Sequence, residues 1–210
     1  MTSAFARITL ACACALALTG CISLFPKSKP VYLYRFGQTA AATEAAPAAA
    51  AGRVGVFRAN GTFQAEAAGD RMLTVTGQEA AYIAESRWVA PASVLFDAAV
   101  LRAFDNDPGR TRLISRGEPA DTDYLLRLDM RNFETRYEAG PELPPTVVVR
   151  LRAAMTRGGA QSLVADRIFE AKVVAGDNRV SAIAAAYDRA VMDILGELVG
   201  WTNSQARPVG

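Results

Sequence analysis

The sequence has no histidine at any of its 210 positions. Histidine is the side chain most often used as a general base near neutral pH and one of the commonest metal ligands, so its absence argues against both kinds of site. Lysine is scarce as well, because only Lys27, Lys29 and Lys172 are present beside 20 arginines. A serine–lysine pair therefore has few residues to draw on.

Motifs that carry chemistry are missing too. The chain contains no G-x-S-x-G, P-loop, H-E-x-x-H or G-x-G-x-x-G pattern. Asp105 with Asp107, and Asp121 with Asp123, are the nearest approach to paired carboxylates, but both pairs flank expected turns or helix ends, where aspartate is ordinary. We expect no catalytic residues, no cofactor and no metal.

Neither an excess of one charge nor a long apolar run is present. The 23 basic and 21 acidic side chains give a formal charge of +2, which offers no electrostatic case for nucleic acid as a partner. The apolar stretch from Ile8 to Leu18 has eleven residues, against the roughly 20 that a transmembrane helix needs. It follows the single charge of Arg7, as in the apolar region of a secretory signal peptide.

The four residues from Leu18 to Cys21 resemble the lipobox of bacterial lipoproteins. In that class the chain is cut just before the cysteine, whose thiol and amino group are then acylated, typically with palmitate. The resemblance implies that Cys21 is the lipidation site and, with Ile22 rather than aspartate after it, that the protein is exported to the outer membrane and faces the periplasm. The alternative is an ordinary signal peptide with an incidental cysteine. Cys12 and Cys14 would be removed with the leader, so no disulfide is expected.

The rest of the chain predicts one domain. Residues 1–20 are the expected signal peptide, 21–30 the acylated tether with Pro26 and Pro30, 31–202 the domain, and 203–210 a flexible tail. Within the domain, residues 38–52 are rich in alanine and are expected to form a loop; a helix is the alternative, but it would have no large apolar residue to bury.

Strand and helix patterns alternate along this domain. Strands are expected from their branched, aromatic or alternating residues, at 31–36, 53–58, 72–76, 79–84, 124–132, 146–156 and 163–173. Helices are expected at 91–105 and, after a capping Ser181, along a stripe of Ile183, Tyr187, Ala190, Val191, Ile194, Leu195 and Leu198. The pattern predicts an α+β fold, an antiparallel meander β-sheet with two helices packed on one face.

Six residues are candidates for interaction with a partner. Arg127, Arg131, Arg150 and Arg152 are expected on the outward face of the sheet, where they can meet lipid headgroups or a protein, or can simply be solvated. Trp88 and Trp201 are candidates for an apolar groove or an interface, but large aromatic side chains are more often buried in the core, and the sequence favours that interpretation.

Several segments together resemble the auxiliary lipoproteins of ABC-type transport systems. They are the lipobox, residues 24–26 and 32–34, the stretch Ala81–Pro91 opening a helix with Leu95-Phe96-Asp97, then 124–128 with Phe133-Glu134, Arg167-Ile168-Phe169, and the closing helix near Trp201. The resemblance covers about residues 31–202, and the alanine-rich segment departs from it as an insertion.

The resemblance implies an accessory subunit of a transporter that contains an ATPase, a permease and an MCE-domain protein. Such systems move phospholipid or other hydrophobic molecules between the two membranes of the envelope. Two mechanisms remain open. In one the domain docks the periplasmic assembly to the outer membrane; in the other it carries a lipid chain in its own pocket. An enzyme of the cell envelope is a third alternative.

Overall fold

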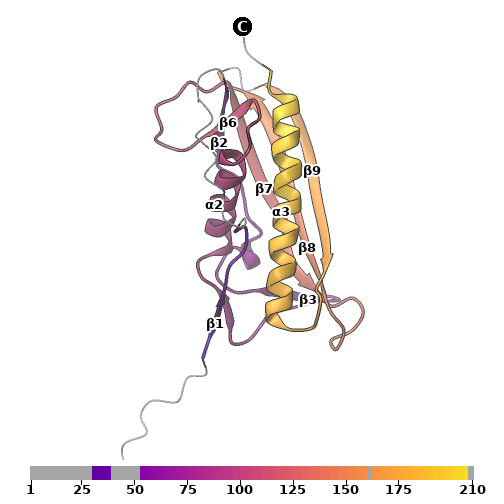
Figure 1. Cartoon of the computed structure of the whole chain (residues 1–210). Coiled ribbons are helices and arrows are strands. Elements are labelled where there is room, and N and C mark those ends of the chain that lie inside the picture. The colour runs from indigo at the N-terminus through magenta and orange to yellow at the C-terminus, as the bar shows by residue number, and fades with distance from the viewer. Residues whose placement is uncertain (1–29, 39–52, 160–161, 208–210) are drawn as a thin grey trace, which may run out of the picture. The chain divides into compact units, whose positions relative to one another are not determined.

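The structure, a computed structural model, describes residues 30–38, 53–159 and 162–207. Figure 1 labels the elements that matter here, and all of those described belong to the compact unit that begins at Val31. In chain order they are β1 (Tyr32–Tyr34), β2 (Val54–Ala59), the 3₁₀ turn η2 (Ala65–Ala67), β3 (Leu73–Thr76), β4 (Glu79–Tyr82), β5 (Ser86–Trp88), α2 (Ala92–Asp105), β6 (Thr111–Ile114), β7 (Tyr124–Arg136), β8 (Thr146–Arg157), β9 (Leu163–Val174) and α3 (Val180–Gln205).

The long strands β7, β8 and β9 form an antiparallel meander, as their alternating residues predict. Leu126 of β7 lies opposite Met155 of β8, and Leu151 of β8 lies opposite Phe169 of β9. Because side chains alternate between the two faces of a strand, this register gathers most apolar side chains of β7 and β8 on one face, whereas the outward face of β9 carries both charged and apolar residues. This part of the predicted sheet is confirmed.

The remainder of the sheet is not antiparallel, so the expected meander is wrong for it. Strand β2 pairs in parallel with β6 and with the first half of β7, whereas β3 pairs in parallel with the end of β7 and antiparallel with β4. The chain between β2 and β6 contains α2, and a parallel neighbour requires such a crossover. Alternation shows which face of a strand is buried but not the direction of its neighbour, and β5 and β6 were not expected at all.

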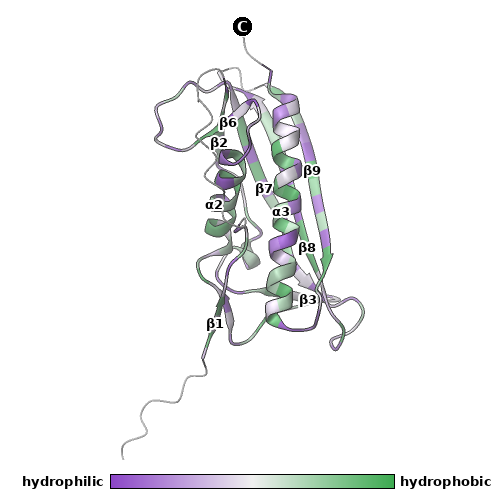
Figure 2. Cartoon of the chain, in the orientation of Figure 1, coloured by the Kyte–Doolittle hydropathy of each residue, from purple (hydrophilic) through white to green (hydrophobic). Residues whose placement is uncertain are grey.

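Both helices cover the apolar face of the seven-stranded sheet (Figure 1). Helix α3 contacts β8 and β9, while α2 contacts β6 and α3. At 26 residues α3 is about 39 Å long, close to the length of the 12-residue strands beneath it. Its expected apolar stripe is buried throughout, from Ile183 to Leu198. Figure 2 shows hydrophilic and hydrophobic residues interspersed along β9.

The ends of α3 differ from the prediction. Arg179 rather than Ser181 occupies the N-cap position, and the helix continues to Gln205. The tail expected from residue 203 is therefore wrong for 203–207, because Asn203 is hydrogen-bonded within the fold and Ala206 is fully buried.

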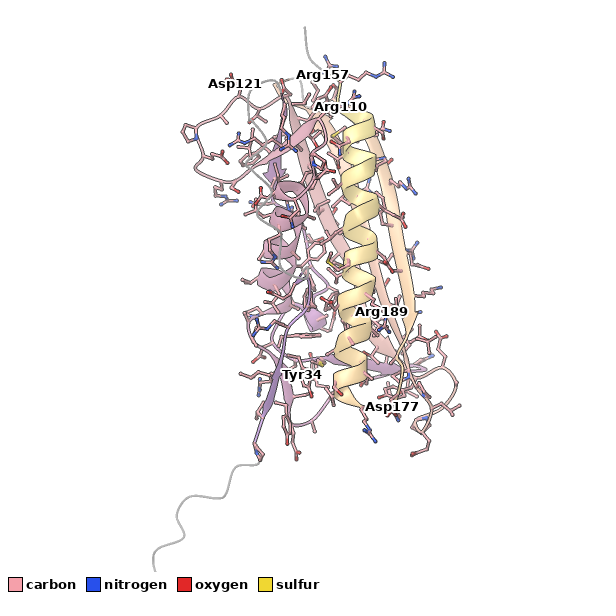
Figure 3. The ribbon with its side chains drawn as sticks, viewed as in Figure 1. Tyr34, Arg110, Asp121, Arg157, Asp177 and Arg189 are labelled. Atoms are coloured by element: carbon pink, nitrogen blue, oxygen red, sulfur yellow. The ribbon has the colours of Figure 1, made fainter. Side chains whose placement is uncertain are left out.

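Charged side chains lie at the ends of the sheet, with Arg157 at one end of the β8–β9 hairpin and Asp177 at the other (Figure 3). Among the described residues no helix is long and apolar enough to cross a membrane.

Candidate functional site

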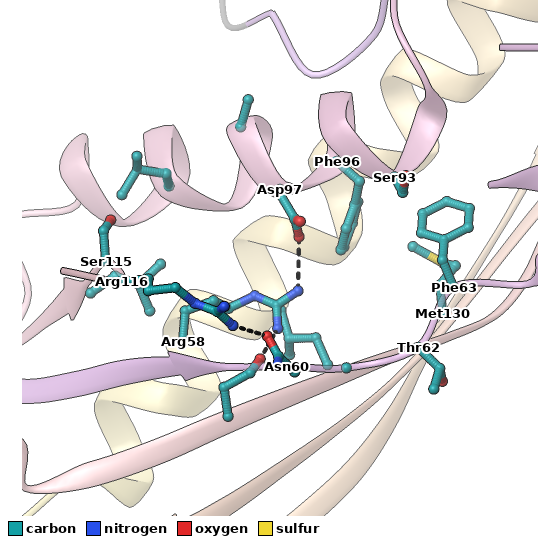
Figure 4. Close-up of a pocket in the computed structure, with 16 residues that line it drawn as sticks. Arg58, Asn60, Thr62, Phe63, Ser93, Phe96, Asp97, Ser115, Arg116 and Met130 are labelled. Carbon is teal, nitrogen blue, oxygen red and sulfur yellow. Dashed lines mark hydrogen bonds and ion pairs between the residues drawn. The ribbon is translucent and has the colours of Figure 1, made fainter. Parts of the chain in front are cut away.

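A cavity of about 560 Å³ lies between α2 and the apolar face of the sheet (Figure 4). Leu128 and Met130 of β7 line it from the sheet, Phe96 lines it from α2, and Phe63 comes from the segment that follows β2. Its size is in the range typical of small-molecule sites, which are mostly apolar with a few polar groups. This cavity is our candidate functional site.

The segment after β2 forms one wall of the cavity because it cannot continue as a strand. Pairing of β2 with β7 stops at Ala59, and β3 joins β7 only at Thr74. Between them the chain passes so close to β7 that a Cβ on Gly61 would lie 1.7 Å from the Leu128 carbonyl oxygen. Only glycine permits this approach. The Met130 amide then donates to the Thr62 carbonyl at 2.8 Å, so that backbone hydrogen bonding to β7 continues between the part paired with β2 and the part paired with β3.

Two guanidinium groups, those of Arg58 and Arg116, line the cavity. Arg58 donates to Asp97 of α2 at 2.9 Å, and Arg116 donates to the side-chain oxygen of Asn60. The Nε of Arg58 is buried and has no hydrogen-bond partner among the described residues. A buried unpaired donor is costly, and arginine forks favour carboxylate and phosphate oxygens. The two guanidinium groups therefore place positive charge beside the cavity, where it would favour an acidic group.

Two buried carboxylates of β7, Asp129 and Glu134, form hydrogen bonds to the segment 62–64 that makes one wall of the cavity. Asp129 accepts from the amide of Thr62 at 2.9 Å and from its hydroxyl at 3.0 Å, and Arg127 lies beside it at 3.1 Å. Burial alone would raise the pKa of Asp129, but the hydrogen bonds from Thr62 and the charge of Arg127 outweigh it, so the pKa is lowered. Asp129 is therefore ionised at neutral pH.

The second carboxylate, Glu134, lies further along β7 and is held by hydrogen bonds in a similar way. It accepts from the side-chain Nε2 of Gln64 at 3.0 Å and from Arg136 at 2.8 Å, while the side-chain Oε1 of Gln64 accepts from the backbone amide of Phe133 at 2.7 Å. The segment 62–64 is thus tied to β7 at both ends, and we expect the cavity wall that includes Phe63 to be rigid.

The structure places the predicted arginines on the outward face of the sheet, but three of them are already paired. Arg127 pairs with Asp129, Arg150 with Glu170 at 3.5 Å, and Arg152 with Asp166 at 2.9 Å. Arg131 occupies the bulge between Met130 and Asn132 and has no ion-pair partner among the described residues. None of the four lines the cavity.

Both tryptophans are buried, which is the alternative that the sequence left open. Trp88 is 2% exposed and packs edge-on against Phe36, with ring centroids 4.9 Å apart, and against Tyr187 at 5.2 Å. Trp201 is 8% exposed and packs against Phe169 at 5.8 Å. Neither indole is presented at the surface. Cys21, the predicted lipidation site, lies outside the described residues.

Sequence reasoning missed the residues of the cavity. Arg58 stands at the end of a predicted strand, Asn60 lies two residues beyond it and Asp97 stands on a predicted helix, but no spacing links them. Their only sequence signal is the break after residue 58, where a polar stretch containing Gly61 interrupts the strand.

The family model described as ABC-type transport auxiliary lipoprotein component matches residues 35–199, in agreement with the resemblance inferred from the sequence. No curated protein matches.

Two solved structures are similar in fold. The crystal structure of protein XCC0632 from Xanthomonas campestris is similar at 24% identity, with 84% of this chain and 96% of that chain covered and a TM-score of 0.69. The structure of hypothetical protein CT253 from Chlamydia trachomatis is similar at 10% identity, with 73% and 97% covered and a TM-score of 0.50. At these identities the likeness is one of fold alone.

Proposed function

Because the chain belongs to the family of ABC-type transport auxiliary lipoprotein components, we propose that it is a non-catalytic lipoprotein of the outer membrane that docks the periplasmic part of an MCE-associated transport system. The family match over residues 35–199 carries this proposal. The partners are an MCE-domain protein with its permease and ATPase, and the cargo is a phospholipid or another hydrophobic molecule.

Two further features support a docking role. The lipobox ending at Cys21 supplies an anchor, and acylation by two or more chains gives stable attachment to a membrane. Shortly after the tether, Val31, Tyr32 and Leu33 leave large apolar side chains exposed at β1. Exposed apolar clusters of this kind are typical of surfaces that bind other proteins.

The test is co-purification of the acylated lipoprotein from its native membranes, with mass spectrometry of the recovered proteins and lipids. We expect an MCE-domain protein and a permease in the eluate. A variant that lacks Cys21 and carries an ordinary cleavable signal peptide, so that it is released without an acyl anchor, is the matched control and is expected to leave the membrane fraction. Recovery of neither partner, with Cys21 fully acylated, would reject the docking role.

The cavity favours a second function, in which the domain holds the acyl chain of a lipid. The apolar side chains of Phe63, Phe96, Leu128 and Met130 that line the cavity suit a hydrocarbon chain. The guanidinium groups of Arg58 and Arg116, which also line it, suit an acidic headgroup. A carrier of this kind would take lipid from the periplasmic assembly and release it at the outer membrane.

Lipid extraction separates the two functions. A carrier released without its anchor, in the variant with an ordinary cleavable signal peptide and no Cys21, is expected to copurify with lipid in a one-to-one ratio, whereas a docking module is expected to carry none. Ala98→Trp fills the cavity and should abolish extraction. Val94→Trp places the same side chain on the exposed side of α2 and should leave extraction unchanged.

A further inference from the structure

Strand β9 is an open edge of the sheet. It pairs with β8 along one side, and within the described part of the chain no strand pairs with its other side (Figure 1). Proteins usually protect such edges with proline, bulges, charged side chains or short strands, because unpaired backbone groups recruit other strands. Here the edge is 12 residues long and contains no proline, although it carries Lys172 and a register shift near Leu163.

Exposed large apolar side chains also gather on this strand. Of the exposed large apolar side chains in the described residues, four belong to β9: Leu163, Val164, Ile168 and Val174. Leu163 and Val174 are 61% and 62% exposed, although they lie at opposite ends of the strand. An exposed, long, apolar edge strand is a site that pairs with another chain.

Charged residues alternate with these apolar positions on the outward face. Asp166 accepts from Arg152 of β8, and Glu170 pairs with Arg150 of β8 and with Lys172 at 3.0 Å. The ladder of ion pairs thus runs from β8 to β9 and ends at the open edge. The hydrogen bond from Lys172 and the charges of Lys172 and Arg150 lower the pKa of Glu170, so this face stays charged down to acidic pH.

We propose that β9 pairs antiparallel with β9 of a second copy of this chain, so that the two sheets become one. In the register centred on Phe169, Asp166 of each copy lies opposite Lys172 of the other. Val164 then lies opposite Val174 at both ends, and the ion-pair ladder continues across the junction.

The neighbouring registers are less favourable. Shifting by an odd number of positions would place outward residues opposite inward ones, since side chains alternate along a strand. Centring on Ile168 places Asp166 opposite Glu170, and centring on Glu170 places that carboxylate opposite itself. Like charges directly opposite one another destabilise a strand pair.

A register centred on Ala171 also pairs Glu170 with Lys172, but it leaves Leu163 to Arg167 without partners from the other β9. The register centred on Phe169 is therefore the one that combines the longest ladder with opposite charges. Such an interface is isologous, as two-fold dimers require.

Cross-linking of the full acylated lipoprotein in its native membrane tests this interface. Ile168→Cys places thiols of the two copies diagonally across the junction, about 7–8 Å apart, within reach of a short bifunctional thiol reagent. Arg127→Cys is the matched control, because it is exposed on the same face of the sheet but lies on β7, two strands from the edge. We expect dimer from the first variant and none from the second.

Charge reversal tests the register. In the Ile168→Cys background, Asp166→Lys places lysine opposite lysine and is expected to reduce dimer at least fivefold. Adding Lys172→Asp restores opposite charges between the copies and is expected to recover it. A local effect from the lost Arg152 pair would not be reversed in this way, so failure of the double variant would overturn the register.

Equal cross-linking of Ile168→Cys and Arg127→Cys would overturn the interface itself. Circular dichroism of each variant shows that the domain is folded. The interface does not depend on the proposed transport role, because co-purification of an MCE-domain protein and cross-linking through β9 can each succeed or fail separately.

Discussion

Single residues decide how the cavity wall is attached to the sheet. Gly61 lets the chain touch the β7 backbone, and the buried carboxylate of Asp129 then fixes Thr62 through two hydrogen bonds. A buried carboxylate is tolerated only where such partners replace water. Substitutions of Gly61 or Asp129 are therefore expected to change the stability of the domain even when they alter very few atoms.

Gly61→Ala is expected to lower the free energy of unfolding by about 1–3 kcal/mol, because the new Cβ meets the backbone of Leu128 and cannot move aside. Gly69→Ala is the control, since a Cβ there meets nothing within 4 Å. Urea denaturation of both variants measures the difference. Equal stability of the two would contradict the close approach at Gly61.

Asp129→Asn is expected to flatten the dependence of stability on pH. The pKa of Asp129 is lower in the folded protein than in the unfolded chain, so the unfolded state binds more protons between the two values and stability rises with pH. This contribution is complete above the unfolded value, about 4, and disappears as pH falls through the folded one.

Urea denaturation between pH 3 and pH 7 should therefore show a smaller loss for Asp129→Asn than for the wild type. Asp97→Asn removes an exposed carboxylate of the same kind and serves as the control. A steeper acid loss in Asp129→Asn would reverse the sign of this argument.

At the scale of elements, the last turn of α3 joins three parts of the fold. The Asn203 oxygen accepts from the Thr111 amide at 3.0 Å and from its hydroxyl at 2.7 Å, while the Asn203 amide donates to Asp107 at 2.8 Å. The C-terminal helix is thereby attached to the start of β6 and to the chain that leaves α2.

Asn203→Ala is expected to cost about 1–3 kcal/mol, because the donors of fully buried Thr111 lose their acceptor. Amide hydrogen exchange should quicken at Thr111, and chemical denaturation should show the loss of stability. Ser204→Ala, an exposed neighbour with only a local bond, should change neither. Unchanged exchange at Thr111 in Asn203→Ala would show that the linkage contributes nothing.

At the scale of the whole domain, a cluster of aromatic rings connects chain segments that are distant in sequence. Trp88 of β5 packs against Phe36, which follows β1, and against Tyr187 of α3. Tyr187 in turn packs against Phe133 of β7 with ring centroids 4.7 Å apart. Burial raises the pKa of Tyr187, whose hydroxyl accepts from Thr135.

Trp88→Ala is expected to lower the free energy of unfolding by about 3–5 kcal/mol, since it empties the centre of this cluster. Tyr32→Ala, at a side chain 62% exposed on β1, should change it by less than about 0.5 kcal/mol. Equilibrium denaturation compares the two. A cost at Trp88 no larger than at Tyr32 would place the cluster outside the cooperative core.

The amino-acid sequence by itself determined the long elements and the family. Alternation identified β7, β8 and β9, and the apolar stripe from Ile183 to Leu198 identified α3, because a periodic pattern is local and records which face is buried. The lipobox that ends at Cys21 is also a local pattern, and the acylation of Cys21 that it predicts remains a prediction.

Only the tertiary structure decided how these elements are joined. Parallel pairing of β2 with β7 depends on a crossover through α2, and the meeting of Arg58, Asp97 and Phe63 at one cavity depends on three separate segments folding together. The pairing of Arg152 with Asp166 likewise depends on register. Such contacts join residues far apart in the chain, and no local periodicity encodes which distant partner a side chain will meet.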